Sequence, residues 1–136
     1  MKQVVYWLDV ACFLALGALV CIYTGWAPRL ASGMVVAATG FALWMAARLQ
    51  LGSSFHPRPR AHALVTTGLY AKFRNPIYLF GEIAYLGLAL AWDRRIGWIC
   101  AALMIPVQIY RSRQEHAVLE KAFGDQYRAY RARTRF

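Results

Sequence analysis

Acidic side chains are scarce in this sequence. Its 136 residues include six Asp and Glu against sixteen Lys and Arg, and charged residues make up only 16% of the chain, whereas 60% are hydrophobic. The length suits one domain, but the composition is too apolar for an ordinary soluble one. We therefore expect a single membrane-embedded domain spanning residues 1–136.

Cysteine is rarer still. Cys12, Cys21 and Cys100 lie inside apolar stretches, are odd in number and show no Cys-x-x-Cys spacing. This pattern supports neither a disulfide framework nor a zinc site, and we interpret the three as small buried hydrophobes. His56 and His62 are separated by prolines and have no further ligands nearby, so we predict no metal site.

Long apolar runs dominate the rest of the chain. Residues 4–26 and 31–51 each approach the roughly 20 residues that cross a hydrocarbon core about 30 Å thick. Residues 76–92 and 96–110 are shorter and predict a tight or partly thinned hairpin. The first run is too long for a cleavable signal peptide. The predicted fold class is an all-α membrane protein with about four transmembrane helices and a cytoplasmic C-terminal helical segment.

The basic residues predict the orientation of this bundle. If the N-terminus and residues 52–75 and 111–136 share one side, the other side keeps only Arg29, Arg94 and Arg95. The positive-inside rule then places both termini and both polar segments in the cytoplasm, as in a multi-pass inner-membrane protein. The net charge of +10 is better explained by anionic membrane lipids than by nucleic acid, because no soluble fold presents it. A homo-oligomer is compatible with the sequence, which does not specify one.

Prolines and a glycine in the two polar segments predict where helices begin and end. Pro57 and Pro59 favour an extended linker, and Asn75 followed by Pro76 predicts a helix that starts at Pro76. Beyond residue 110 a cytoplasmic helix is expected from the spacing of apolar and aromatic residues, with Gly124 ending one helix and Asp125 capping the next. The residues that carry this spacing are Leu119, Phe123, Tyr127 and Tyr130.

Two motifs in these segments carry a family resemblance. Residues 64–78, LVTTGLYAKFRNPIY, resemble the stretch shared by integral-membrane isoprenylcysteine carboxyl methyltransferases and their bacterial and phospholipid-methylating relatives. Residues 111–130 resemble the second pattern of that family, an arginine, a Glu-Glu pair and LxxxFGxxYxxY. Two positions depart from the patterns: His116 stands in place of the second Glu, and Phe80 stands where a glycine is common, with Gly81 one place later.

The resemblance implies S-adenosylmethionine as the methyl donor and a set of residues that bind it. Arg111 and Glu115 are the implied catalytic pair, with Glu115 also binding the amino group of the cofactor and Arg111 orienting the acceptor. Gly68 would admit a close backbone approach, tyrosine rings would contact the adenine or the sulfonium, and Arg74 with Asn75 would bind the carboxylate or an anionic acceptor group. The full cofactor-binding set is Leu64, Val65, Gly68, Tyr70, Arg74, Asn75, Pro76, Tyr78, Glu115 and Tyr127.

Plainer interpretations of the same residues remain open at this point. The tyrosines also suit a membrane-interface belt, and Arg111 with Glu115 also suits an ordinary surface pair one helical turn apart. His116 fits a solvated side chain at the headgroup level better than a general base.

The expected acceptor is a lipidic or amphipathic molecule that enters from the bilayer. A carboxylate acceptor needs no general base, whereas an amine must first lose a proton, and the sequence offers no dedicated base. This slightly favours a carboxylate or a thiol. Two other functions compete: a small four-helix transporter that uses the intramembrane acid Asp9 or Glu82, and an inactive scaffold of the same fold, for which His116 and Phe80 would argue.

Overall fold

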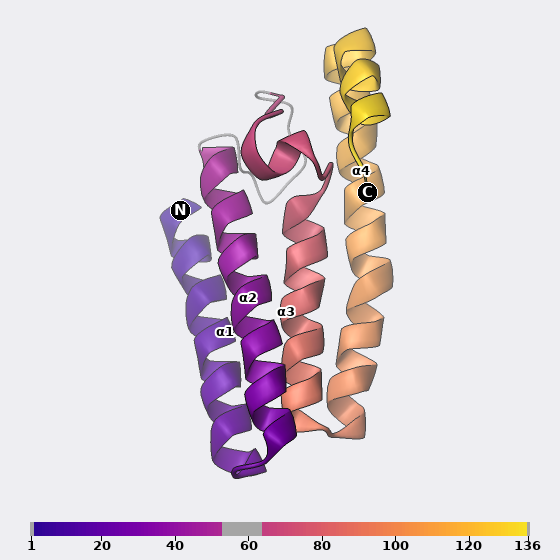
Figure 1. The fold of residues 1–136 in the computed structure, drawn as a ribbon. Helices are drawn as coiled ribbons and strands as arrows, with labels where there is room; N and C mark the ends of the chain where they lie inside the picture. Colours follow the sequence, from indigo (N-terminus) through magenta and orange to yellow (C-terminus); the bar gives the residue numbers. More distant parts are fainter. Residues whose placement is uncertain (1, 53–63, 136) are drawn as a thin grey trace.

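Four long helices form the molecule, as seen in a computed structural model that describes residues 2–52 and 64–135, with side chains from Val10 onward (Figure 1). They are α1 (Lys2–Thr24), α2 (Pro28–Leu51), α3 (Pro76–Trp92) and α4 (Arg95–Arg133), and a short 3-10 helix, η2 (Gly68–Ala71), precedes α3. The helices run alternately up and down, so the N-terminus, η2 and the far half of α4 lie at the same end (Figure 1). The all-α prediction and the juxtaposition of the two polar segments are confirmed.

The start of α3 follows from its sequence. Pro76 occupies the first helical turn, where its missing N–H breaks no helical hydrogen bond, and the helix then runs to Trp92, as the apolar run of residues 76–92 predicted. Asp93 ends it in a left-handed conformation with φ 50°, and α4 starts two residues later. This tight turn holds α3 and α4 side by side as an antiparallel pair.

Small residues bring α2 and α3 into backbone contact. A methyl group on Gly33 would overlap the backbone of Ala91, one on Gly87 would overlap the backbone of Ala37, and one on Gly40 would lie 2.6 Å from the amide nitrogen of Ala84. Such close approach is how helices associate in lipid, where apolar burial contributes little. Gly33, Ala37 and Gly40 are spaced four and three residues apart along α2, a pattern that predicts a close helix–helix contact. The sequence analysis above did not identify this contact.

Apolar side chains cover much of the outer surface. Leu14 is 60% exposed, Ile22 74%, Val35 66% and Leu103 61%, and exposure of this kind around a bundle suits a lipid surrounding. Among the described residues, only α2 combines the length and hydropathy of a complete membrane span, while α3 and residues 10–24 of α1 are apolar but shorter. The prediction of four crossings therefore stays a prediction.

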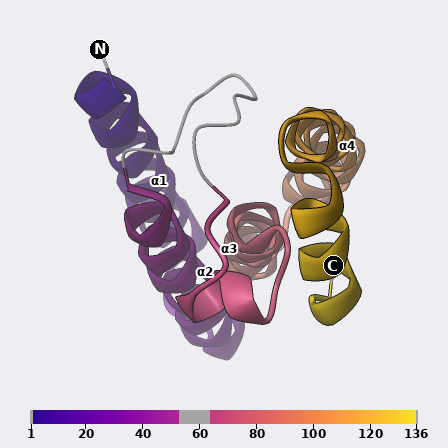
Figure 2. The ribbon, with the colours of Figure 1, turned by 90° about the horizontal axis from the view of Figure 1, so that it is seen from above.

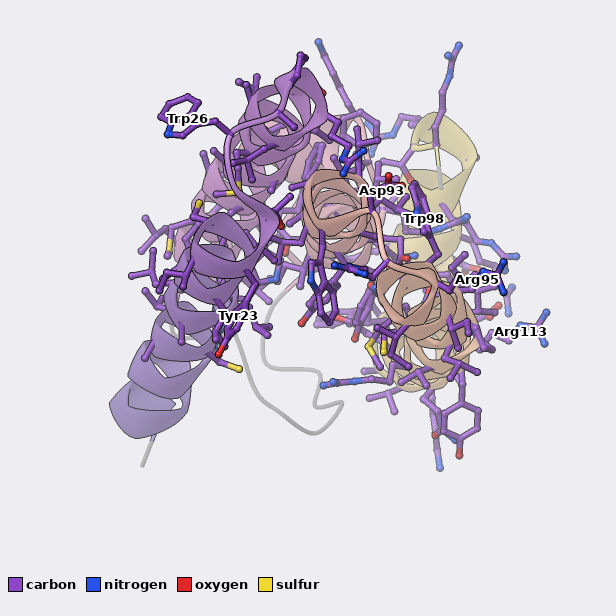
Figure 3. The ribbon with its side chains drawn as sticks, turned by 90° about the horizontal axis from the view of Figure 1, so that it is seen from below. Tyr23, Trp26, Asp93, Arg95, Trp98 and Arg113 are labelled. Carbon is purple, nitrogen blue, oxygen red and sulfur yellow. The ribbon has the colours of Figure 1, made fainter. Side chains whose placement is uncertain are left out.

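Aromatic and charged residues gather at the end opposite the N-terminus (Figure 3). Trp26, in the turn between α1 and α2, is 99% exposed, and Trp98 is 42% exposed. Arg29, in the first turn of α2, forms an ion pair of 3.2 Å with Asp93, which lies between α3 and α4. This pair links the two interhelical connections at this end. Indole rings at this level are typical of a membrane–water interface.

Beyond the bundle, α4 bends sharply at Gly124. This residue has φ 48°, a conformation that residues other than glycine rarely adopt, so the chain changes direction and the last helical segment leaves the axis of α4 at a large angle (Figure 2). The predicted break at Gly124 is confirmed. The end of the chain returns to the loop before α3, where the amide of Arg74 donates to the carbonyl of Arg135 and the amide of Arg135 donates to the carbonyl of Lys72, each at 3.0 Å.

Candidate cofactor and acceptor site

The side chain of Asn75 joins α3 to α4. Asn75 stands at the cap position of α3 but makes no side-chain capping bond. Its Nδ2 instead donates to Oγ of Ser112 at 2.8 Å, and the amide also lies within hydrogen-bond distance of Nε2 of His116, 3.0 Å from Nδ2 and 3.2 Å from Oδ1. The side chain of Asn75 therefore bonds to α4 and ties the loop before α3 to the polar half of that helix.

His116 is not the freely solvated side chain that the sequence suggested. It is half-buried between Asn75 and the ring of Tyr127, whose centroid lies 6.1 Å away. Burial lowers the pKa of His116 below its ordinary value, and the nearby positive charges of Arg74 and Arg131 lower that pKa further. A neutral imidazole at pH 7 can accept a hydrogen bond from Asn75 or Ser112, so this departure from the family pattern has a structural role.

Glu115 lies beside Tyr78 from the neighbouring helix. The Tyr78 hydroxyl makes side-chain hydrogen bonds with both Glu115 and Arg111, which brings the two predicted catalytic residues together around one group of α3. Burial raises the pKa of Glu115, while the hydrogen bond from Tyr78 and the charge of Arg111 act in the opposite direction. A carboxylate in this setting is better stabilised when a cation stands next to it.

Arg74 and Tyr127 each present a buried polar atom toward the same region. Tyr127 is completely buried, and neither its hydroxyl nor Nε of Arg74 has a hydrogen-bond partner among the described residues. The charge of Arg74 acts on the pKa values of His116, Tyr127 and Tyr130, which places the guanidinium close to all three side chains. A buried polar group left without a partner costs about 1–3 kcal/mol, so this arrangement favours a ligand that supplies partners.

Tyr70 connects η2 to the last helical segment. Its carbonyl accepts a hydrogen bond of 2.8 Å from the hydroxyl of Tyr130, and both rings are buried. Burial raises the pKa of the Tyr70 hydroxyl strongly, and the neighbouring Glu115 adds to this, so Tyr70 also lies near Glu115. Burial likewise raises the pKa of Tyr130 to about 12.

The remaining residues of the predicted cofactor-binding set make contacts that support the local backbone. Gly68 has φ 61° and starts η2, where the side chain of Gln50 packs against it and accepts a hydrogen bond from the amide of Leu69 at 2.8 Å. Pro76 is buried at the start of α3, and Leu64 and Val65 are half-buried before η2. The site therefore centres on side chains from residue 70 onward.

Phe80 also has a structural explanation. Its ring meets the ring of Phe73 edge-on at 5.5 Å, beneath the short bridge that Phe73 forms with Arg135. A methyl group on Gly81 would lie 3.4 Å from the ring of Trp44, so the glycine one position later receives the α2 side chain. Phe80 supports the loop that carries Arg74 and Asn75.

Several residues of the site were not predicted. Ser112, Gln108 and Tyr130 bond to residues of α3 or η2, and the first two precede His116 by one and two helical turns, a spacing that could have identified them. No group of metal-ligating side chains occurs within residues 10–52 and 64–135. His56 and His62 lie outside the described residues, as does the side chain of Asp9.

Comparison with known proteins identifies the family of this chain. The model of a family described as phospholipid methyltransferase matches residues 26–126, about three quarters of the chain. The chain belongs to the phospholipid methyltransferase family. No curated protein and no solved structure matches it. The family match covers α2, η2, α3 and α4 as far as Gln126. Most of the clustered side chains therefore lie within the part of the chain that matches a membrane-associated methyltransferase family.

Proposed function

We propose that this protein transfers a methyl group from S-adenosylmethionine to a lipidic or amphipathic acceptor at the cytoplasmic face of the membrane. Family membership supports methyl transfer. The observation that carries the choice of donor is the cluster of Arg74, Glu115 and Tyr127, which combines a cation, a buried carboxylate and a buried hydroxyl within one region. These are the groups that an amino acid zwitterion attached to a sulfonium requires.

The residues fit that donor as follows. The guanidinium of Arg74, with its buried Nε, would bind the donor carboxylate, and the carboxylate of Glu115 would bind the donor ammonium group. The hydroxyl of Tyr127 would gain a partner, and the rings of Tyr70 and Tyr78 would offer faces to the adenine or the sulfonium, a contact of about 0.5–2 kcal/mol. S-adenosylmethionine supplies an activated methyl group, and the protein supplies its orientation.

Catalysis in such a site rests on positioning. Methyl transfer is an in-line displacement, so the protein must hold the two reactants in line and exclude water rather than form a covalent bond itself. Arg111, which contacts Tyr78, would orient the acceptor beside the donor site. Asn75 and His116 would fix the separation of α3 and α4, on which this alignment depends.

The proposed location follows from charge. The described parts of the two polar segments, residues 64–75 and 111–135, lie at one end of the bundle with the start of α1 (Figure 1), and these two parts contain most of the basic residues of the sequence. We propose that this end faces the cytoplasm, where S-adenosylmethionine is available, and that the acceptor arrives through the bilayer. The protein would then be a multi-pass inner-membrane protein with both termini cytoplasmic.

Equilibrium binding to the detergent-purified protein tests the proposal. S-adenosylmethionine should bind at micromolar concentration, and Arg74→Ala and Glu115→Gln should each weaken binding by about 10-fold or more, since a charge-assisted hydrogen bond contributes about 1.5–3 kcal/mol. Glu120→Gln is the matched control, because Glu120 lies on the same helix and bonds to Arg128 instead. Binding that is absent in the unmodified protein would favour an inactive scaffold or a transporter.

A further inference from the structure

Arg74 is a cation that pairs with no acid among the described residues. Its side chain is half-buried, and its Nε is buried without a hydrogen-bond partner there. The acids in the polar half of α4 that act on this region are engaged elsewhere: Glu115 bonds to the hydroxyl of Tyr78, and Glu120 forms an ion pair of 3.3 Å with Arg128. Charges that leave water are ordinarily paired, so the guanidinium of Arg74 has charge to offer to a ligand.

His116 stands where an acid would neutralise Arg74. Asn75, the residue after Arg74, lies within hydrogen-bond distance of Nε2 of His116. Burial is the main cause that lowers the pKa of His116, and the charge of Arg74 is the next, so the guanidinium lies close to the imidazole. The sequence pattern that this segment resembles has a Glu at this place, and a carboxylate there would pair with Arg74. His116 brings no negative charge.

The contacts of His116 suit a neutral imidazole. Nδ2 of Asn75 lies 3.0 Å from Nε2, so the tautomer that carries its proton on Nδ1 accepts a hydrogen bond from this amide. The positive charges of Arg74 and Arg131 oppose protonation, while Glu120 favours it least strongly of the charges that act on the ring. At pH 7 the side chain therefore fills its place beside Arg74 without adding charge of either sign.

We propose that His116 determines the choice of methyl donor: by leaving Arg74 without a counter-ion from the protein, it makes the site select a sulfonium nucleoside that carries a carboxylate. This rests on the proposed function and adds the reason why S-adenosylmethionine binds in preference to its decarboxylated form. His116 acts through Arg74 rather than on the donor itself, so it is a positioning residue and not a catalytic one.

The charges of the two donors explain why residue 116 decides between them. S-adenosylmethionine brings a carboxylate for Arg74 and an ammonium group for Glu115, whereas the decarboxylated donor brings two positive charges and no negative one. Arg74 without a counter-ion repels that second donor. A glutamate at position 116 would reverse the preference, because it would occupy Arg74, repel the carboxylate and favour the extra positive charge.

Equilibrium binding of both donors to the detergent-purified protein tests the proposal. S-adenosylmethionine and its decarboxylated form are titrated separately, and the ratio of their dissociation constants is compared between variants. The unmodified protein should prefer S-adenosylmethionine by about 10-fold or more, the equivalent of one charge-assisted hydrogen bond. Arg74→Ala should lose most of this preference.

Two substitutions of His116 separate its charge from its packing. His116→Glu should reduce the preference by about 10-fold or more, because binding of S-adenosylmethionine weakens while binding of the decarboxylated donor does not. His116→Gln stays neutral and can still accept a hydrogen bond from Asn75, so its preference should stay within about threefold of that of the unmodified protein. Ala117→Glu is the matched control, since it adds the same charge at the next residue of α4, which is exposed. Its preference should change by less than about twofold.

Several results would overturn the proposal. They are an unchanged preference in His116→Glu, equal weakening of both donors in that variant, loss of the preference in His116→Gln, and an effect of Ala117→Glu as large as that of His116→Glu. If His116→Glu does not fold, an unchanged preference in Arg74→Ala has the same consequence. An unmodified protein that binds both donors equally overturns the proposal but leaves S-adenosylmethionine as a donor. A protein that binds neither removes the proposed function as well.

Discussion

Two tyrosines one turn apart should respond oppositely to loss of their hydroxyl groups. Tyr127 and Tyr130 both lie on the last segment of α4, both are buried, and their ring centroids are 6.1 Å apart. The Tyr130 hydroxyl donates to the Tyr70 carbonyl at 2.8 Å, whereas the Tyr127 hydroxyl has no partner among the described residues. The same Tyr→Phe change therefore removes a satisfied group in one case and an unsatisfied group in the other.

The magnitudes follow from those partners. Tyr130→Phe leaves the carbonyl of Tyr70 buried and unpaired, which should lower the free energy of unfolding by about 1–3 kcal/mol. Tyr127→Phe removes a hydroxyl that is itself unpaired, so the free energy of unfolding of the free protein should rise by up to about 1–3 kcal/mol. If the Tyr127 hydroxyl is kept for S-adenosylmethionine, the stabilised variant should bind it about 3- to 10-fold more weakly, the equivalent of one ordinary hydrogen bond.

Thermal unfolding in detergent and isothermal titration with S-adenosylmethionine measure the two effects. Tyr110→Phe is a suitable control for both, because Tyr110 lies on the same helix, is exposed and bonds only to the exposed Gln114 within the described residues. Its change should be close to zero. If Tyr127→Phe lowers the unfolding temperature as Tyr130→Phe does, or leaves cofactor affinity unchanged, then Tyr127 is a packing residue and the reasoning is refuted.

Three further outcomes are expected. Because the pKa of Glu115 is raised in the free protein and a cationic ligand favours the ionised form, affinity for S-adenosylmethionine should increase as pH rises through that pKa, and a Glu115→Gln titration should be flat there. The pKa of His116 in the folded protein lies below 6.5, so neutral His116 should contribute to stability above pH 6.5. This contribution should be lost as pH falls through the folded-state pKa, and thermal unfolding of His116→Gln should not show the loss. Gly87→Val should destabilise the bundle by about 1–3 kcal/mol, because the added side chain overlaps the backbone of Ala37. Gly17→Ala should be tolerated, because its methyl group lies 3.7 Å from the flexible end of Met34. Equal unfolding temperatures for the two variants would contradict the close packing of α2 and α3.

The parts of the fold that depend on local chemistry were predictable. Pro76 can begin a helix but cannot continue one, and the apolar run after it ends at Trp92, so both bounds of α3 could be read directly. Gly124 followed by Asp125 marked the bend in α4 for the same kind of reason. The clustering of the two polar segments followed from the alternation of four helices and the placement of basic residues.

The contacts between helices were not predictable from the sequence. Asn75 has the chemistry of a helix cap, but the partners offered by Ser112 and His116 take its side chain instead. His116 looked solvated because nothing in the sequence shows that α3 and the loop before it would cover it. Likewise, the pairing of Glu82 with Gln108 requires the register of α3 against α4, which the tight turn at Asp93 sets.

Transfer of a labelled methyl group to lipid is the most direct test of the account. Membrane vesicles that contain the protein, with the cytoplasmic face outward, are incubated with S-adenosylmethionine labelled in its methyl group, and radioactivity is counted in the lipid extract. The account predicts transfer that depends on the protein, is lost in Arg74→Ala and Glu115→Gln, and is retained in Glu120→Gln. No transfer above empty vesicles, or equal transfer by Glu115→Gln, would contradict the claim that this cluster is the site of methyl transfer.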